Sequence, residues 1–158
     1  GVAHGLLYHY FSSKDEVLET IFREQWGILV DRISAIEASG EPAVDQLRHV
    51  AAVVLRNWRH QPDVIRVLVR EIARSPEVQQ RIGELVKPIA AVQRIIERGQ
   101  ASGELRADLH PQFAAVVFYG GIEELLSGWV LGQLPDDDES VAAGEQTVGQ
   151  LLDGFRAP

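Results

Sequence analysis

Apolar residues recur along most of the chain three and four positions apart, a spacing that places them on one face of an α-helix. No stretch alternates apolar and polar residues as a half-buried strand would, and no segment is repeated. The pattern therefore predicts an all-α fold. The helices that it predicts cover approximately residues 14–39, 42–61, 63–74, 76–99, 111–131 and 140–155.

Local signals mark where several of these helices begin or break. Ser13 and Glu16 match a capping box, in which the two side chains bond to backbone N–H groups at the start of a helix. Ser140 is expected to cap the last helix. Pro88 falls inside an apolar stripe, and because proline has no backbone N–H we expect it to kink or split that helix.

The helix at 111–131 is apolar on nearly all sides, so both of its flanks must be covered. The last helix carries small residues among its apolar ones, which allows another helix to approach closely. A symmetric dimer in which these two helices pair with their copies in a four-helix bundle would cover the apolar surface, and a single self-contained core is the alternative. The residues expected at the dimer interface are Val117, Leu125, Trp129, Val148, Leu152 and Phe155.

The composition is that of a soluble globular domain. The chain has 158 residues, of which 46% are hydrophobic and 24% charged, enough for one domain with a substantial core. No apolar run reaches the roughly 20 residues that span a bilayer, and the first residues lack the layout of a signal peptide. We therefore expect a cytoplasmic protein with no membrane partner. The lack of cysteine excludes disulfides and thiolate metal sites.

The sequence contains no catalytic or cofactor motif. Its five histidines do not have the spacing of metal ligands, and it has neither a glycine-rich phosphate loop nor a nucleophile elbow. We expect no enzymatic activity, no cofactor and no metal. The formal net charge of −8 argues, for these residues taken alone, against a nucleic-acid-binding protein.

The first residues have an unusual composition for a surface helix, because Tyr8, His9 and Tyr10 would cover every face of a short helix with polar-aromatic side chains. The stretch G-V-x-x-G-x-L-Y-H-Y-F-x-S-K-x-E-V-L at 1–18 resembles the signature with which TetR-family transcriptional regulators end their recognition helix and begin the next helix. A looser pattern, S-G-E-L-R-A-D-L-x-P-x-x-A-A at 102–115, is similar to the regulatory domain of the subgroup that senses fatty acyl-CoA.

The resemblance implies a TetR-like helical bundle that contains only the recognition helix of a helix-turn-helix domain. Residues 1–12 would be the remnant of that DNA-binding domain, and residues 13–158 the ligand-binding and dimerisation domain. The other two helices, which are basic in the family, would precede Gly1, so the acidic charge would describe the regulatory body and not the DNA-facing surface. The residues that the resemblance places at operator DNA are Gly5, Leu6, Tyr8, His9, Tyr10 and Lys14.

A ligand site is expected where the interior stripes of the body converge. Pro88 and the pair Gly120–Gly121 favour imperfect packing, which can leave an apolar cavity, and a filled core is the alternative for each residue. Glu123 is included because a carboxylate in so apolar a helix needs a partner. The predicted ligand-binding residues are Leu55, Trp58, Leu68, Ile72, Ile89, Val92, Ile96, Phe118, Ile122 and Glu123.

The resemblance implies a homodimeric repressor that binds operator DNA and is released by a small apolar ligand, with a fatty acyl-CoA or a fatty acid as the candidate. Arg94, Arg98 and Arg106 would then be the candidates for the CoA phosphates, unless they lie on a solvated helix face. The helix that begins at Lys14 would connect the ligand site to the DNA. A ligand-binding or protein-interaction domain without DNA binding is the alternative that the sequence leaves open.

Overall fold

The computed structural model describes residues 14–60, 62 and 86–158 of the chain. Apart from one isolated β-bridge, between Leu105 and Arg156, the regular structure of these residues is helical. The prediction of an all-α fold is therefore confirmed. The described helices are α2 (Lys14–Glu37), α3 (Ala43–His60), α7 (Lys87–Ala101), α8 (Pro111–Val130) and α9 (Asp138–Asp153).

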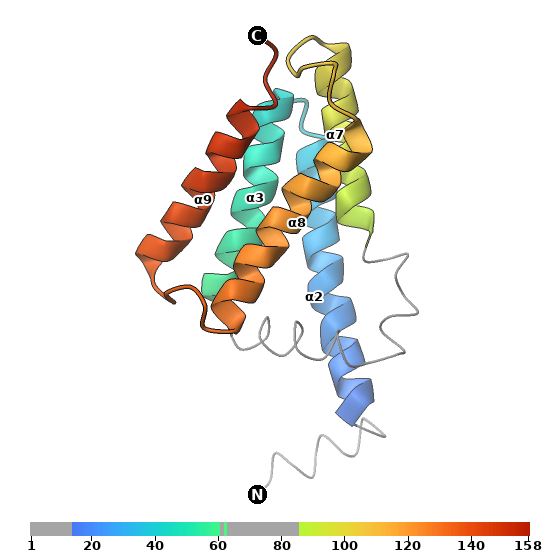
Figure 1. Cartoon of the computed structure of the whole chain (residues 1–158). Coiled ribbons are helices and arrows are strands. Elements are labelled where there is room, and N and C mark those ends of the chain that lie inside the picture. Colours follow the sequence, from blue (N-terminus) through green and yellow to red (C-terminus); the bar gives the residue numbers. More distant parts are fainter. Residues whose placement is uncertain (1–13, 61, 63–85) are drawn as a thin grey trace, which may run out of the picture.

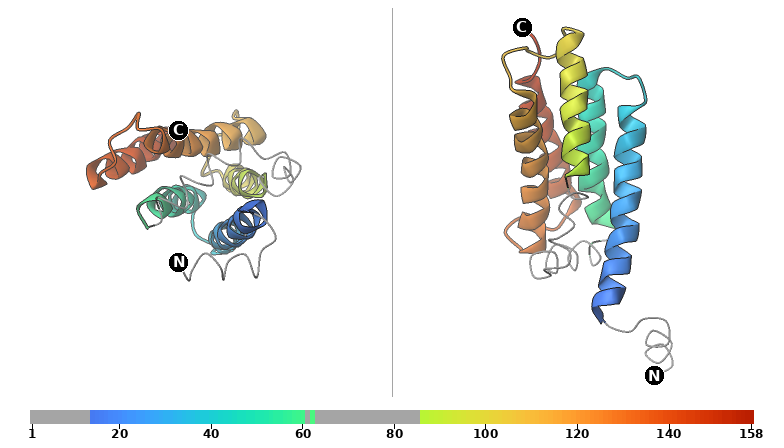
Figure 2. Two further views of the ribbon diagram at one scale, coloured as in Figure 1. Left: turned by 90° about the horizontal axis from the view of Figure 1, so that it is seen from below. Right: turned by 90° about the vertical axis from the view of Figure 1, so that its right-hand side faces the viewer.

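The described helices form a bundle (Figure 1). Helices α2, α3 and α7 lie next to one another, and α8 and α9 cover the side of α3 and α7 that faces away from α2 (Figure 2). The N-terminal turns of α2 extend past the ends of α3, α7 and α8 in both side views (Figures 1 and 2). Among the described helices, α2 contacts α3 and α7.

The core lies between α3, α7 and α8. Leu47 and Leu55 of α3, Val92 of α7, and Phe118 and Ile122 of α8 are all fully buried in it. Helix α8 is long and apolar enough to cross a membrane by length and composition, but it contacts α3, α7 and α9 within the bundle. The same apolar composition is expected of the central helix of a soluble protein.

A proline lies at the beginning of α7. Helix α7 begins at Lys87, with Pro88 in its first turn. A proline is tolerated there because the first N–H groups of a helix have no partner within the helix. The helix start at Lys87 is consistent with a split at Pro88, but the part of the predicted helix 76–99 that precedes residue 86 lies outside the described residues. The predicted helix at 63–74 and the capping residue Ser13 lie outside them as well.

The prediction that Ser140 caps the last helix is wrong. Asp137 is the N-cap of α9, and its carboxylate accepts a hydrogen bond of 2.8 Å from the backbone N–H of Ser140. Ser140 lies within the first turn instead, where its hydroxyl accepts a bond of 2.9 Å from Nε1 of Trp129. Asp137 is the better cap because its charge also interacts favourably with the positive end of the helix dipole.

Gly99 lies inside α7, although the sequence places it at the end of that helix. Helix α7 continues to Ala101, and Gly103, with a φ of +80°, follows its C-cap. A Cβ at Gly99 would lie 2.7 Å from the Cβ of Ala43 and from Cδ1 of Leu105. Glycine at 99 is therefore required by close packing between α7, α3 and the loop that follows α7.

Gly99→Ala is expected to lower the free energy of unfolding by about 1–2 kcal/mol, because overpacking outweighs the higher helix propensity of alanine. Gly27→Ala is the matched control, since Gly27 also lies inside a helix but a Cβ there would meet nothing within 4 Å. Gly27→Ala should raise the free energy of unfolding by about 0.5–1 kcal/mol. Urea unfolding of both variants measures the difference, and equal stabilities would contradict the close packing at Gly99.

Candidate functional site

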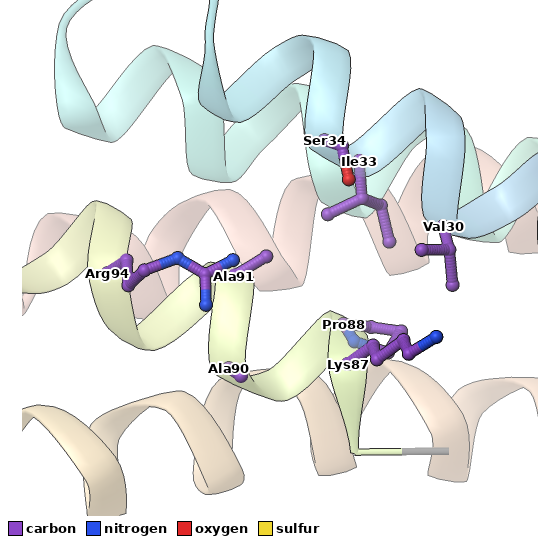
Figure 3. A pocket seen from close by; sticks show the side chains of 8 residues that line it. All are labelled: Val30, Ile33, Ser34, Lys87, Pro88, Ala90, Ala91 and Arg94. Carbon is purple, nitrogen blue, oxygen red and sulfur yellow. The ribbon is translucent and has the colours of Figure 1, made fainter. Parts of the chain in front are cut away.

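A pocket opens between α2 and α7, next to the place where α7 begins. Val30, Ile33 and Ser34 of α2 point across it toward Lys87 and Pro88 of α7 (Figure 3). Ala90, Ala91 and Arg94 complete the lining from α7. The alanines have short side chains, so the two helices do not fill the space between them. The pocket has a volume of about 170 Å³.

The walls of this pocket are apolar, and its two ends are cationic. Val30, Ile33 and Pro88 supply the apolar surface, while Lys87 and Arg94 lie seven residues apart on α7, two turns of the helix. Ligand pockets usually have volumes of about 300–1,000 Å³. The described pocket can therefore hold only part of a large ligand, such as the region where an apolar chain meets an anionic group.

The two cations differ in their surroundings. The guanidinium of Arg94 makes a two-point ion pair with the carboxylate of Glu37, with distances of 2.7 and 2.8 Å. Lys87 has no ion pair within the described part of the chain, and its side chain is exposed. Of the two cations, Lys87 is therefore the one that no described carboxylate engages. Lys87 is not among the site residues predicted from the sequence, because a lone lysine before a proline forms no recognisable motif.

Glu37 is held at the C-terminal end of α2 by several groups. Besides Arg94, Arg98 lies 3.3 Å from its carboxylate and also donates to its backbone carbonyl at 3.0 Å. The hydrogen bond from Arg94 is the main reason that the pKa of Glu37 lies below its usual value, and burial of the carboxyl acts in the opposite direction. Glu37 is therefore ionised throughout the physiological range of pH.

Gln46 of α3 joins the same cluster from the other side. Its side chain is buried, and its Nε2 donates to the carbonyl oxygens of Ile36 and Glu37 at 2.9 and 3.2 Å. Its Oε1 accepts from Arg98 at 3.2 Å. The last turn of α2 is thus bonded to both α3 and α7.

The arginines proposed for the CoA phosphates are engaged within the chain. Arg94 and Arg98 bind Glu37, and Arg106 makes a two-point ion pair with Asp108 at 2.6 Å. This pairing raises the pKa of Arg106 and lowers that of Asp108. A phosphate would have to displace a carboxylate from any of the three.

The structure gathers half of the predicted ligand-binding residues in one place. Leu55, Val92, Ile96, Phe118 and Ile122 are buried together in the core, and Ile89 packs against them. Glu123 as a residue is exposed on α8. Neighbouring atoms shield its carboxyl group partly from water, and this desolvation raises its pKa. The assignment of these residues to a ligand stays a prediction. Leu68 and Ile72, and the side chain of Trp58, lie outside the described residues.

An exposed apolar stripe runs along α8. Phe113, Val116 and Val117 are 69%, 49% and 59% exposed, and Gly120 and Gly121 continue the stripe at helical spacing. Added Cβ atoms at the two glycines would meet nothing within 4 Å, so this face is smooth and open. We define these five residues as the α8 stripe. An apolar surface of this kind is typical of a protein–protein contact.

The residues predicted for the dimer interface divide into two groups. Val117 is part of the α8 stripe, and Leu125 is half-buried. The other four are buried within a single copy of the chain, so they cannot present their side chains to a second copy in this arrangement. They pack into the core because α9 lies across α3 and α8, which the sequence pattern does not reveal. These four are Trp129, Val148, Leu152 and Phe155.

The residues predicted to contact DNA lie outside the part of the chain that the structure describes. This holds for Gly5, Leu6, Tyr8, His9 and Tyr10, and for the side chain of Lys14, the first residue of α2. Their roles stay predictions. Among the described residues, no cluster of His, Asp or Glu has the arrangement of a metal site.

Comparison with protein families identifies most of the chain. Residues 22–151 match the family described as the C-terminal region of YsiA-like proteins, one of the TetR C-terminal families. The matched range includes all of α3, α7 and α8 and most of α2 and α9. It therefore covers the pocket and the α8 stripe.

Individual relatives agree with this match. The chain is 27% identical over 154 residues to the fatty acid metabolism regulator protein of Bacillus subtilis, which covers 96% of this chain and 78% of the relative. The structure of the Bacillus subtilis transcriptional regulator FadR in complex with stearoyl-CoA is similar, with a TM-score of 0.70, 25% identity and coverage of 94% and 79%. That of FadR from Bacillus halodurans has a TM-score of 0.75 and 22% identity, with coverage of 95% and 80%, and shows the same fold.

Proposed function

The chain belongs to the TetR-type regulators with a YsiA-like C-terminal region, and on this premise we propose that it is a dimeric repressor that leaves its operator when it binds a long-chain fatty acyl-CoA. A ligand-responsive transcriptional regulator is the function of the family, whose members are not enzymes. Three features of this function are proposals for the chain: that it binds an operator, that it forms a dimer, and that its ligand is a long-chain fatty acyl-CoA. A regulator of this kind acts in the cytoplasm.

The pocket between α2 and α7 is the observation that carries the proposal. A fatty acyl-CoA joins a long apolar chain to a headgroup with several phosphates, and the pocket joins apolar walls to the ammonium of Lys87, which has no ion pair among the described residues. The chain as a whole is acidic, with a formal net charge of −8, so an anionic ligand needs a local cation. The complex of the similar Bacillus subtilis regulator with stearoyl-CoA supports the choice of this ligand class.

The acyl chain would extend from this pocket toward the apolar core. Ile33 and Ala91 line the pocket and also belong to the core that contains Val92, Ile96 and Phe118. Separation of α2 from α7 would therefore open a continuous apolar path inward. The core residues named above would contact the acyl chain along this path.

Helix α2 would carry the signal to the DNA. Its middle part lines the pocket, and its first residue, Lys14, follows the stretch that resembles a recognition helix. We retain residues 1–12 as the end of a DNA-binding domain, with Tyr8, His9 and Tyr10 at the operator. A ligand can act only if it binds better to the conformation that does not fit the operator.

The α8 stripe would form the dimer contact. Five small or apolar residues share one face of α8, and a second copy related by twofold symmetry would place the same residues opposite one another. Leu151 of α9 is also exposed, at 38%, and would lie in the same contact if α9 joins α8 in a four-helix bundle. Such a dimer would place its two DNA-binding domains in a twofold arrangement, which matches the symmetry of a palindromic operator.

The proposal is tested by release of an operator from the full gene product, after selection of the operator from random DNA. Acyl-CoAs of increasing chain length should dissociate the complex with a preference for long chains, while free CoA and short acyl-CoAs should not. Binding of acyl-CoA without binding of any DNA would support the alternative of a ligand-binding domain that does not bind DNA.

A further inference from the structure

We infer that Tyr119 of α8 is the polar anchor of the apolar ligand site, where its hydroxyl donates a hydrogen bond to the carbonyl oxygen of the acyl thioester. The inference rests on the proposed function, because it concerns the same ligand. It adds a residue that selects the chemistry of the ligand, and Tyr119 is not among the site residues predicted from the sequence.

Tyr119 lies in the apolar core of the bundle. It belongs to the first half of α8, next to Phe118, and the two residues are 1% and 0% exposed. Ile33 and Ala91, which line the pocket between α2 and α7, belong to the same core. Tyr119 therefore lies among the apolar residues through which the acyl chain would extend from that pocket.

The hydroxyl of Tyr119 has no hydrogen-bond partner among the described residues. No fully buried polar side-chain atom in the described part of the chain lacks a partner, so this hydroxyl oxygen is not fully buried. The ring is enclosed, while the oxygen at its tip keeps contact with open space. The polar end of Tyr119 is thus accessible to a small group that enters the core.

Other buried polar side chains in the described part of the chain are used by the fold itself. On the same helix, Nε1 of Trp129 donates a bond of 2.9 Å to the hydroxyl of Ser140, and Nε2 of Gln46 donates a bond of 2.9 Å to the carbonyl of Ile36. The hydroxyl of Tyr119 contributes no such bond. A phenylalanine would fill the same space without the cost of removing a hydroxyl from water. Departures of this kind are expected at functional sites, where a ligand supplies the missing partner.

The surroundings of Tyr119 select a neutral acceptor. Burial is the main reason that the pKa of Tyr119 lies above its usual value, and the Glu123 carboxylate, one turn further along α8, acts in the same direction. The hydroxyl is therefore protonated and can donate throughout the physiological range of pH. A second negative charge close to Glu123 is disfavoured, so a neutral carbonyl oxygen fits better than an ionised carboxylate. In a fatty acyl-CoA this is the thioester oxygen, which lies between the CoA phosphates and the acyl chain.

The test compares two ligands in the full gene product and in its Tyr119→Phe variant. Palmitoyl-CoA contains the thioester carbonyl, whereas S-hexadecyl-CoA has the same chain length and headgroup but a methylene group in place of the carbonyl. The wild type should bind palmitoyl-CoA at least about fivefold more tightly than S-hexadecyl-CoA, since one hydrogen bond is worth about this factor. Tyr119→Phe should reduce the ratio to less than about twofold by weakening palmitoyl-CoA alone. Isothermal titration calorimetry measures the four affinities.

Ile122→Val is the matched control. Ile122 is also fully buried on α8, and the substitution removes a methyl group without changing any polar group. Any loss of affinity should therefore be the same for the two ligands, so that their ratio stays at the wild-type value. A ratio that falls equally in Ile122→Val and in Tyr119→Phe would overturn the inference, because general packing would then account for both changes.

Urea unfolding without ligand separates an anchor from a structural residue. The midpoint of Tyr119→Phe should equal or exceed that of the wild type, because the hydroxyl has no described partner to lose. A lower midpoint, or failure to fold, would assign the hydroxyl to the fold and overturn the inference.

The binding data distinguish this inference from the proposed function. If the wild type binds palmitoyl-CoA but Tyr119→Phe keeps the wild-type ratio, or if the wild type binds both ligands equally, the inference alone is overturned. If the wild type binds neither ligand, the proposed function fails and the inference fails with it.

Discussion

Val117→Asp is expected to convert the protein from a dimer to a monomer at micromolar concentration and to weaken operator binding at least 100-fold. Val117 is 59% exposed at the centre of the α8 stripe. In a twofold contact the two introduced carboxylates would face each other, and an unpaired buried charge costs about 3–5 kcal/mol, equal to a factor of about 100 or more in the dissociation constant. Analytical ultracentrifugation measures the dimer, and fluorescence anisotropy measures binding to the operator.

Ile28→Asp is the control for this prediction. Ile28 is also an exposed apolar residue, at 48%, but it lies on α2 and not on the α8 stripe. The variant should remain dimeric. A dimer of normal stability in Val117→Asp would show that the α8 stripe is not the contact between copies, and would leave the family assignment unaffected.

Lys87→Glu is expected to weaken binding of palmitoyl-CoA at least tenfold and to leave binding of palmitate within a factor of three. The ammonium of Lys87 lies at one end of the pocket between α2 and α7 and has no ion pair among the described residues. Reversal of its charge removes an attraction to the CoA phosphates and adds a repulsion, each worth about 1 kcal/mol at an exposed position. Isothermal titration calorimetry with both ligands measures the two affinities.

Arg32→Glu changes the net charge by the same amount and serves as the control. Arg32 is exposed on α2 and does not line the pocket. Its substitution should leave both affinities within a factor of three, because a solvated charge that does not contact the ligand is screened by salt. Equal losses in Lys87→Glu and Arg32→Glu would show that Lys87 acts through net charge and does not contact the ligand.

The helices could be predicted from the sequence because each depends on local patterns. The 3.6-residue period of the apolar positions locates α2, α3 and α8 within a few residues, and Pro88 marks the start of α7. Periodicity also selects the residues of the core, such as Leu55 and Ile96. Periodicity does not show whether an apolar face packs against the same copy of the chain or against a second copy. Trp129 and Leu152 were therefore expected at a dimer interface, but both are buried in the core of one copy.

The contacts around Glu37 could not be predicted in this way. Glu37 and Arg94 are far apart in the sequence, and each is an ordinary charged residue on a helix surface until the helices pack. The same holds for Glu104, whose carboxylate accepts bonds of 2.7 and 2.8 Å from the backbone N–H groups of Ala43 and Val44 at the start of α3. Long-range polar contacts of this kind carry no local pattern, so they become visible only in the structure.

We propose that a long-chain acyl-CoA, held between α2 and α7, lowers the affinity of this regulator for its operator. The most direct measurement is the dissociation constant of the full gene product for its selected operator, with saturating palmitoyl-CoA and with free CoA at the same concentration. We expect palmitoyl-CoA to raise this constant by about 5–150-fold, the usual range of coupling between two sites, and free CoA to leave it unchanged. Equal dissociation constants in the presence of the two ligands would show that a long-chain acyl-CoA does not release this regulator from its operator.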